Sequence, residues 1–254
     1  MQVAVVTGAS SGIGAALARE LAARGWLCVL LARREERLRA LAAEIAGEYE
    51  LCDVSDRAAV DACAAHVLER HPAVDLLVNN AGVPARATFL EGEAERIERA
   101  VQTNYLGGVW CLRAFLPGLD AARPSDVVNV VSVAGTVAFP PSGPYSASKH
   151  AQLAFSRATS ASLRTRGIRV HTVNPGFVET EGFPQRSVLR SAFFRRTVLD
   201  AEDVARHIAG VVGEPPRETT IPSWYRWPAV LQALAPNVTA RLIARRGGMY
   251  RRRG

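Results

Sequence analysis

The stretch V-A-V-V-T-G-A-S-S-G-I-G-A-A-L-A-R-E-L-A-A-R-G, from Val3 to Gly25, decides the fold that this sequence predicts. A short apolar run meets a glycine-rich turn, and a segment rich in alanine and leucine follows as far as Gly25, which is typical of a strand, a tight turn and a helix. The first N–H groups of such a helix have no intrahelical partner, and the helix dipole favours a negative charge in front of them. The stretch therefore predicts a site for the phosphates of a nucleotide.

Three glycines shape this turn. We expect Gly8 to permit the tight turn, Gly12 to let the backbone approach a pyrophosphate, and Gly14 to let the helix pack closely against the strand. Their spacing, G-x-x-x-G-x-G, differs from the commoner G-x-G-x-x-G, and the Gly-Lys-Ser/Thr of a nucleoside-triphosphate loop is missing. A glycine pattern alone is weak evidence, so the prediction depends on the flanking strand and helix. The same predicted site takes in Ser10, Ser11 and Ile13.

Two arginines follow the second apolar run, W-L-C-V-L-L-A, which ends at Ala32. In dinucleotide-binding folds an acid at the end of this strand binds the ribose hydroxyls of adenosine, whereas an arginine accommodates a 2′-phosphate. Here Arg33 and Arg34 occupy the position, and the first carboxylate, Glu35, is expected inside the next helix. The pair therefore favours NADP(H) over NAD(H). A solvated helix start is the alternative, although cations are unfavourable at a helix N-terminus unless an anion binds there.

Three further strand ends should reach the same edge of the sheet. Asp53, followed by Val54, is expected to accept a hydrogen bond from the adenine amino group, and a helix N-cap is its alternative role. The run D-L-L-V-N-N-A-G suits a tight wall with side-chain amides holding backbone loops, although this composition is common in turns. The segment after N-P-G can offer backbone and hydroxyl groups to a nicotinamide carboxamide. These two motifs predict the cofactor residues Asn80, Ala81, Gly82, Pro175, Gly176, Val178 and Thr180.

A serine, a tyrosine and a lysine mark the stretch from Ser132 to Lys149. Ser132 follows the apolar run D-V-V-N-V-V, at the strand end where open α/β sheets hold ligands. Tyr145 and Lys149 lie four residues apart on one face of a predicted helix. A cation beside the phenol should lower its pKa from about 10 and make it an acid–base catalyst. Lys149 is the only lysine in the chain, and a solvated surface lysine is the plainer alternative.

Two other segments carry candidate residues. A long helix is expected from about 93 to 115, and Asn104 interrupts it, because its amide competes for backbone hydrogen bonds. The asparagine serves either the chemistry or a local bond. The segment 181–199 mixes phenylalanine with arginine, and a loop of this length in a compact domain is usually a lid or binding loop. We expect Phe183 and Phe193 to contact a fairly apolar substrate, with filling of core space as the alternative.

Size and composition exclude several classes of protein. With 254 residues, 48% of them hydrophobic, the chain suits one large α/β domain, and we expect a single domain over 1–254. No apolar run reaches the roughly 18 residues of a spanning helix, and a strand-like run at the start leaves no room for a signal peptide. Four cysteines in apolar contexts, without a CxxC, indicate reduced thiols in a cytoplasmic protein. No metal site is expected.

The positive charge is concentrated at the C-terminus. The formal net charge is +7, and removing six arginines of the last fourteen residues leaves the remainder near neutral. The sequence contains no recognisable nucleic-acid module, so we expect no nucleic-acid partner and favour contact between the tail and an acidic surface. These arginines are Arg241, Arg245, Arg246, Arg251, Arg252 and Arg253.

Taken in order, the motifs T-G-A-S-S-G-I-G, D-V, N-N-A-G, Y-x-x-x-K and P-G-x-V-x-T resemble those of the single-domain short-chain dehydrogenase/reductase family, over about residues 3–222. The resemblance implies an α/β fold of the Rossmann type: a doubly wound, seven-stranded parallel sheet with helices on both faces. It also implies NAD(P)-dependent interconversion of an alcohol and a carbonyl, by hydride transfer to or from a small molecule.

The resemblance assigns a role to each catalytic candidate. Tyr145 would be the general acid–base, and Lys149 would lower its pKa and hold the nicotinamide ribose. Ser132 would hydrogen-bond the substrate carbonyl, where charge grows in the transition state. Asn104 would position a water molecule in a proton relay. Arg33 matches the position that selects NADP in this family.

The C-terminus departs from the family pattern. Many members end in a glycine-rich tail that packs in a tetramer, whereas here residues 223–254 are rich in tryptophan and arginine and predict a short helical extension, two helices split by Pro236. We expect a homo-oligomer, dimer or tetramer. Trp224, Tyr225 and Trp227 either close the substrate site, form a dimer contact or touch a membrane surface. The alternative function is a non-catalytic dinucleotide-binding regulator, and a nucleotide-sugar epimerase is disfavoured because the chain lacks a larger substrate domain.

Overall fold

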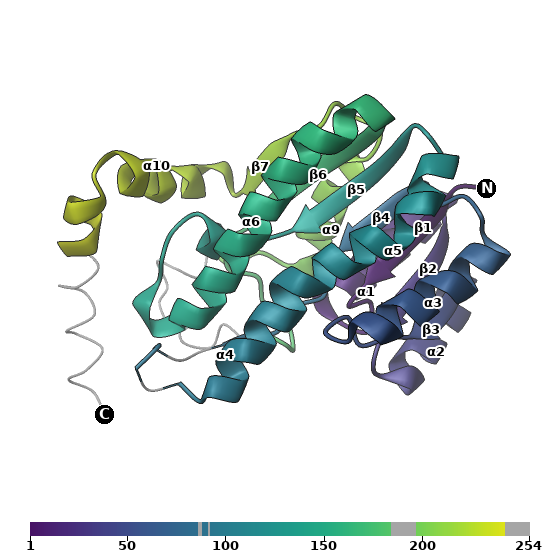
Figure 1. The fold of residues 1–254 in the computed structure, drawn as a ribbon, viewed down its shortest axis with the longest axis horizontal. Coiled ribbons are helices and arrows are strands. Elements are labelled where there is room, and N and C mark those ends of the chain that lie inside the picture. Colours follow the sequence, from purple (N-terminus) through teal and green to yellow (C-terminus); the bar gives the residue numbers. More distant parts are fainter. Residues whose placement is uncertain (86–87, 91, 184–196, 242–254) are drawn as a thin grey trace.

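Seven parallel strands form one sheet in the order β3-β2-β1-β4-β5-β6-β7 (Figure 1). The computed structural model describes residues 1–85, 88–90, 92–183 and 197–241. The predicted seven-stranded parallel sheet is confirmed. Its strands are β1 (Val3–Thr7), β2 (Leu27–Ala32), β3 (Glu48–Leu51), β4 (Leu76–Asn79), β5 (Ser125–Val130), β6 (Ile168–Pro175) and β7 (Glu218–Ile221).

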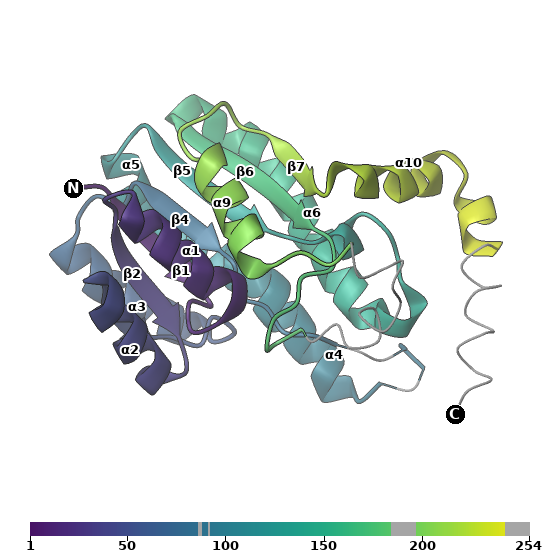
Figure 2. The same cartoon turned by 180° about the vertical axis from the view of Figure 1, so that it is seen from behind.

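Helices cover both faces of the sheet, as the doubly wound fold requires (Figures 1 and 2). Helices α1, α2 and α9 share a buried cluster on one face, and α3, α5 and α6 share another on the opposite face. The described helices are α1 (Gly12–Ala23), α2 (Glu35–Ile45), α3 (Arg57–Arg70), α4 (Ala94–Val101), α5 (Gly107–Ala121), α6 (Gly143–Leu163), α9 (Ala201–Val211) and α10 (Arg226–Leu234).

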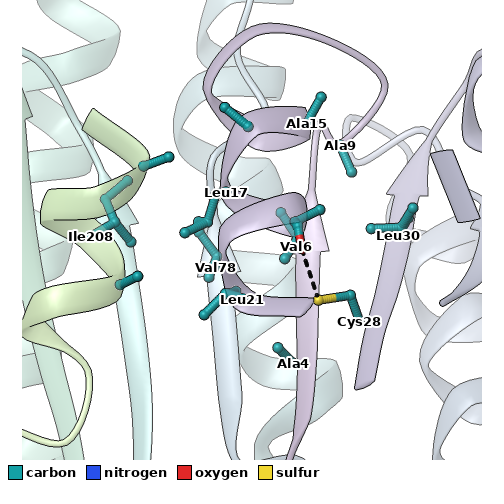
Figure 3. Close-up of a cluster of buried hydrophobic side chains, with 14 of the residues drawn as sticks. Ala4, Val6, Ala9, Ala15, Leu17, Leu21, Cys28, Leu30, Val78 and Ile208 are labelled. Carbon is teal, nitrogen blue, oxygen red and sulfur yellow. Dashed lines mark hydrogen bonds between the residues drawn. The ribbon is translucent and has the colours of Figure 1, made fainter. Parts of the chain in front are cut away.

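The core between β1, α1 and α9 fixes the position of the first helix. Figure 3 shows Val6 of β1 and Leu17 of α1 within one cluster, with Ile208 of α9 beside them. All three side chains are fully buried. Because both faces of the sheet are covered, its central strands are nearly continuous apolar runs rather than alternating ones. All four cysteines are buried and free, as the sequence predicts.

The topology creates a crevice at one edge of the sheet. Strand β1 lies between β2 and β4, so the chain leaves β1 toward one side and β4 toward the other. In open α/β sheets ligands bind at this switch point, outside the carboxyl ends of the strands. The glycine turn, the N-N-A-G motif and Ser132 all follow directly on these strand ends. The fold therefore brings together motifs that are far apart in the sequence.

The helix expected over 93–115 differs in detail. It forms as α4, then a π-helical turn at Gln102–Leu106, then α5, which continues to Ala121. Asn104 lies in the π turn, so the predicted interruption is confirmed, and π turns often mark functional sites. The predicted C-terminal helices are also present, because residues 236–241 are helical again after α10. Among the described residues, no helix is long and apolar enough to cross a bilayer.

Candidate active site

A cavity of about 940 Å³ lies at the carboxyl ends of the strands. This is at the upper end of the range for ligand pockets. Nearly every described residue that the sequence assigns to a site lines this cavity, from the glycine turn to Phe183. Of the described candidates, Gly14 and Asn104 do not line it, and Phe193 lies outside the described residues.

The glycine turn is as tight as predicted. Gly8 has a φ of +68°, and a Cβ there would lie 2.8 Å from the Cα of Ala81. A Cβ on Gly14 would lie 2.5 Å from the carbonyl oxygen of Gly8, so close packing of helix on strand requires glycine. Helix α1 begins at Gly12 with no side-chain cap and no acidic residue in its first turn. Its first N–H groups therefore remain available to an anion.

Thr7, the last residue of β1, is a site residue that was not predicted from the sequence. Its hydroxyl donates to the Val78 carbonyl and accepts from the backbone N–H groups of Asn80 (3.0 Å) and Ala81 (3.1 Å). The Asn80 side-chain amide donates in return to the Thr7 carbonyl at 2.9 Å. This confirms that a side-chain amide holds the backbone loops together. A hydroxyl residue directly before the first glycine is the signal that could have identified Thr7.

The two arginines reach the cavity at its β2 end. Arg34 donates from Nη2 to the hydroxyls of Ser10 (3.0 Å) and Ser11 (2.5 Å), and Arg33 donates from Nη1 to Asp53 at 3.2 Å. Both arginine side chains remain about half exposed, at 50% and 43%. Arg34 thus meets two hydroxyls, and Arg33 lines the same cavity, where the sequence predicts a 2′-phosphate. These contacts argue against a merely solvated helix start.

Asp53 closes a turn and holds an arginine. Its Oδ1 accepts from the Ser55 N–H (3.0 Å) and hydroxyl (2.7 Å), while its Oδ2 faces Arg33. Burial raises the pKa of the Asp53 carboxyl, but the bonds from Ser55 and the charge of Arg33 outweigh this and lower it. The N-cap alternative for Asp53 is wrong, because Asp56 caps α3.

Glu181 is a second residue that the sequence analysis missed. It follows β6 and reaches across to α2, where it pairs with Arg34 at 3.4 Å and with Arg37 through two bonds. The Glu181 carboxylate therefore places a negative charge beside Arg34. A bound anion would have to share Arg34 with this carboxylate. No spacing in the sequence indicates this pairing, because it joins residues about 145 positions apart.

Tyr145 and Lys149 lie together at the other end of the cavity. Both belong to α6, and the Lys149 Nζ lies 5.9 Å from the centre of the tyrosine ring. Lys149 is only 3% exposed, so the solvated-lysine alternative is wrong. Its Nζ donates to the Val130 carbonyl at 3.1 Å and to the Gln152 Oε1 at 2.7 Å. The ammonium is therefore held by neutral oxygens, with no carboxylate among these two acceptors.

Burial has the largest effect on the pKa values of both Tyr145 and Lys149. It lowers the pKa of Lys149 to about 7, and it raises the pKa of the Tyr145 phenol to about 12, although a hydrogen bond with Ser132 lowers the latter. The expectation that Lys149 depresses the pKa of Tyr145 is thus wrong for this arrangement. The reason is that desolvation disfavours the charged form of both side chains, while the ammonium bonds to Val130 and Gln152.

Gln152 is the third missed residue. It is 2% exposed and lies one helical turn after Lys149, with which it shares a face of α6. A hydrogen bond from a cation favours the cation, so Gln152 opposes the loss of charge that burial imposes on Lys149. The signal in the sequence is a polar side chain three residues after the lysine.

Asn104 ties two segments of the site together. Its Oδ1 accepts from the Val83 N–H at 2.7 Å, and its Nδ2 donates to the Val83 carbonyl (3.1 Å) and to the Ser148 hydroxyl (3.0 Å). Ser148 in turn donates to the Tyr145 carbonyl. The loop after β4 is thereby fixed against α6. These contacts support the local-bond reading of Asn104, and its role in a proton relay stays a prediction.

Aromatic rings surround the Tyr145 end. Phe183 lies 5.6 Å from Tyr145 between ring centres, tilted by 56°, and Phe139 and Phe177 also line the cavity. The latter two were not predicted. Trp224, Tyr225 and Trp227 do not belong to the described lining, so the idea that they close the site is not borne out by the described residues. Tyr225 packs edge-on against Phe177, which is one of the lining residues.

Comparison with known proteins adds an independent line of evidence. A family model described as short chain dehydrogenase matches residues 2–187. A farnesol dehydrogenase of Aedes aegypti is 37% identical over 229 residues, which cover 85% of this chain and 91% of that protein.

Two solved structures resemble the fold closely. One is an alcohol dehydrogenase from the archaeon Thermococcus sibiricus complexed with 5-hydroxy-NADP, with 29% identity. The other is a variant of actinorhodin polyketide ketoreductase with NADPH, with 30% identity. Each superposes with a TM-score of 0.78 and covers 87% of this chain and 95% of its own.

Proposed function

The chain belongs to the short-chain dehydrogenase family and is an NAD(P)-dependent oxidoreductase, and we propose that it interconverts a carbonyl and an alcohol on a fairly apolar small molecule, with NADP(H) as its cofactor. The observation that carries the proposal is one cavity with Ser132, Tyr145 and Lys149 at one end and two arginines at the other. A phosphate-recognising end and an acid–base end in one crevice are what this reaction needs.

The residues present fit a nicotinamide dinucleotide. The uncapped start of α1 and the backbone cradle at Gly8 and Gly12 suit a pyrophosphate. Asp53 suits the adenine, and Val178 and Thr180 suit the carboxamide. When bound, the cofactor supplies or takes up the hydride. The protein's part is to bind, to orient and to move the proton.

The acid–base residues can serve the reaction in both directions. In reduction, the substrate carbonyl carbon gains a hydride and its oxygen gains a proton, which the Tyr145 hydroxyl donates. With a pKa of about 12 the phenol is protonated at neutral pH and ready to donate. Ser132, which bonds the phenol, is placed to donate a second hydrogen bond to the same oxygen. In alcohol oxidation the same proton moves the other way, and the Tyr145 phenolate is the base that accepts it.

The preference for NADP(H) rests on the arginine end. Arg34 contacts Ser10 and Ser11, and Arg33, which is paired with Asp53, lines the same cavity. Charge-assisted bonds to a phosphate are about twice as strong as neutral ones. The two related structures contain 5-hydroxy-NADP and NADPH, which supports the same cofactor here.

The substrate class follows from the aromatic lining. Phe139, Phe177 and Phe183 surround the Tyr145 end, and the relative from Aedes aegypti is named for an apolar alcohol. We extend the proposal to a homo-oligomer, dimer or tetramer, in the cytoplasm. The four buried, free thiols support a reducing compartment.

The test combines binding and turnover. Thermal unfolding with equal concentrations of NADPH or NADH should show the larger shift for NADPH, because a ligand at a hundredfold excess over Kd stabilises by about 2.7 kcal/mol. Oxidation of NADPH should then depend on added apolar aldehydes or ketones. Binding without turnover of any carbonyl or alcohol would favour the dinucleotide-binding regulator instead. A larger shift with NADH would contradict the assignment of Arg33.

A further inference from the structure

Helix α10 presents an apolar face to solvent. Its large apolar side chains follow one another at spacings of three and four residues, which places them on one side of the helix. Their exposed fractions are 73% for Trp227, 43% for Val230, 43% for Leu231 and 81% for Leu234. Trp224, before the helix, and Val238, after it, are exposed at 47% and 49%. We call these six side chains the apolar stripe.

The orientation of α10 is the reverse of that of an ordinary surface helix. The side toward the body carries Gln232, which accepts a hydrogen bond from the Ala138 N–H at 3.2 Å, and the half-buried Ala229. Surface helices normally turn their apolar stripe to the core and their polar side to water. Figures 1 and 2 show α10 leaving the body beside β7 and extending away from the sheet. An apolar face in this position marks an interaction surface.

The charge of the extension identifies the partner. Residues 223–254 contain seven arginines and no aspartate or glutamate, whereas the whole chain carries a net charge of +7. Residues 1–222 are therefore balanced, and the entire surplus sits on the segment that carries the apolar stripe. Two copies of this chain that paired through their stripes would bring two such positive segments together, which like charges oppose. A surface that is both apolar and negatively charged fits the segment better.

We propose that the extension docks this enzyme on the surface of an anionic membrane, with the apolar stripe in the boundary between head groups and acyl chains. Amphipathic segments with tryptophan and leucine on one side and arginine nearby bind membranes in this way. Arginines near an anionic surface strengthen such binding by electrostatic attraction, and the apolar side chains add the burial of their own surface.

The apolar stripe lies next to residues that line the cavity. Ala138, which holds Gln232, is followed by Phe139 of the cavity lining. Tyr225 stacks on Trp224 of the stripe, at 4.0 Å between ring centres, and packs edge-on against Phe177 of the lining. Docking would therefore place the cavity close to substrates dissolved in the bilayer. This consequence rests on the proposed function, but docking itself does not.

The experiment is co-sedimentation of the full chain with vesicles, measured without substrate. Vesicles of phosphatidylcholine with about 30 mol% phosphatidylglycerol should bind the protein at low salt, and vesicles of phosphatidylcholine alone should bind it much more weakly. The double variant Trp227→Ser, Leu234→Ser should lose about tenfold or more in partitioning, because it removes the two most exposed members of the stripe. Leu90→Ser is the matched control, since Leu90 is 96% exposed elsewhere and should change nothing.

Three results would overturn the proposal. The first is that the parent does not bind anionic vesicles at low salt, and the second is that the parent and the double variant bind them equally. The third is that the parent does not bind vesicles but forms a stable oligomer in solution, while the double variant is monomeric. The last result would assign the stripe to a second copy. The thermal midpoint of each variant checks its folding. If the parent protein shows no oxidoreductase activity, that result contradicts the proposed function but does not affect the vesicle result.

Discussion

The two ends of the cavity handle charge in opposite ways. At the β2 end, Arg33 and Arg34 are half exposed and pair with residues from other loops, Asp53 and Glu181. At the α6 end, Lys149 is 3% exposed and bonds only to neutral oxygens in its described contacts. Exposed ion pairs contribute little to stability and can exchange partners, whereas a buried cation has its pKa set by its surroundings. One end is suited to recognising an anion and the other to moving a proton.

The largest effect is expected at the buried end, from Tyr145→Phe. The ring and its contact with Phe183 remain, and only the hydroxyl that donates the proton is lost. General acid–base groups contribute about 10²- to 10⁴-fold to rates, so kcat should fall by that factor. The affinity for NADPH, measured by titration of the purified protein, should stay within about twofold, since binding depends on the other end. A variant that keeps its kcat would show that the two ends do not divide the work as proposed.

At the exposed end, Arg33→Ala should change selectivity rather than rate. A hydrogen bond to a charged group contributes about 1.5–3 kcal/mol, so the ratio of kcat/KM for NADPH to that for NADH should fall about 10- to 100-fold. Arg39→Ala is the matched control, because Arg39 lies on the same helix, pairs with Glu35 and does not line the cavity. Its ratio should stay near that of the parent. Equal losses in both variants would point to the general positive field instead of a contact by Arg33.

The burial of Lys149 should also appear in the pH dependence of stability. Its folded pKa of about 7 lies below the ordinary value of 10.5, so the unfolded chain binds more protons between these two values. Stability must therefore rise with pH in this window, and the contribution is lost as the pH falls toward 7. From pH 7 to 9 the unfolding free energy of the parent should rise by about 2 kcal/mol more than that of Lys149→Met. Chemical denaturation at each pH measures the unfolding free energy of both proteins. If the unfolding free energy depends on pH in the same way in both, burial does not lower the pKa of Lys149 as described.

The contrast between the two ends also explains what the sequence could predict. Strand ends and glycine spacing are local signals, so the parallel sheet, the turn at Gly8 and the convergence of Ser132 with Tyr145 and Lys149 could be predicted. Long-range pairs such as Arg37 with Glu181 leave no such signal. The predicted lowering of the pKa of Tyr145 is wrong for a related reason. Sequence spacing shows that a cation lies nearby, but the depth of burial depends on the packing of the whole site.

Gln152 offers the finest test of how the buried end works. Its Oε1 accepts from the Lys149 ammonium at 2.7 Å and so favours the charged form. Gln152→Leu keeps the volume but removes the acceptor, and the pKa of Lys149 should fall by about one unit, which one charged hydrogen bond accounts for. If cationic Lys149 assists Tyr145, the alkaline limb of the kcat profile should move to lower pH, with only a few-fold loss of kcat at pH 7.

A second substitution at Gln152, with the opposite expected effect on the pKa of Lys149, separates this prediction from a simple loss of protein stability. Gln152→Glu puts a negative charge beside the same ammonium, raises the pKa of Lys149, and should move the alkaline limb to higher pH. A residue that merely fills space would lower the thermal midpoint in both variants and leave both pH profiles in place. Shifts of opposite sign would therefore identify Gln152 as a residue that positions and tunes Lys149. If the pH profiles of both variants coincide with that of the parent, Gln152 has no role in the reaction. The pKa of Lys149 is then set by burial alone.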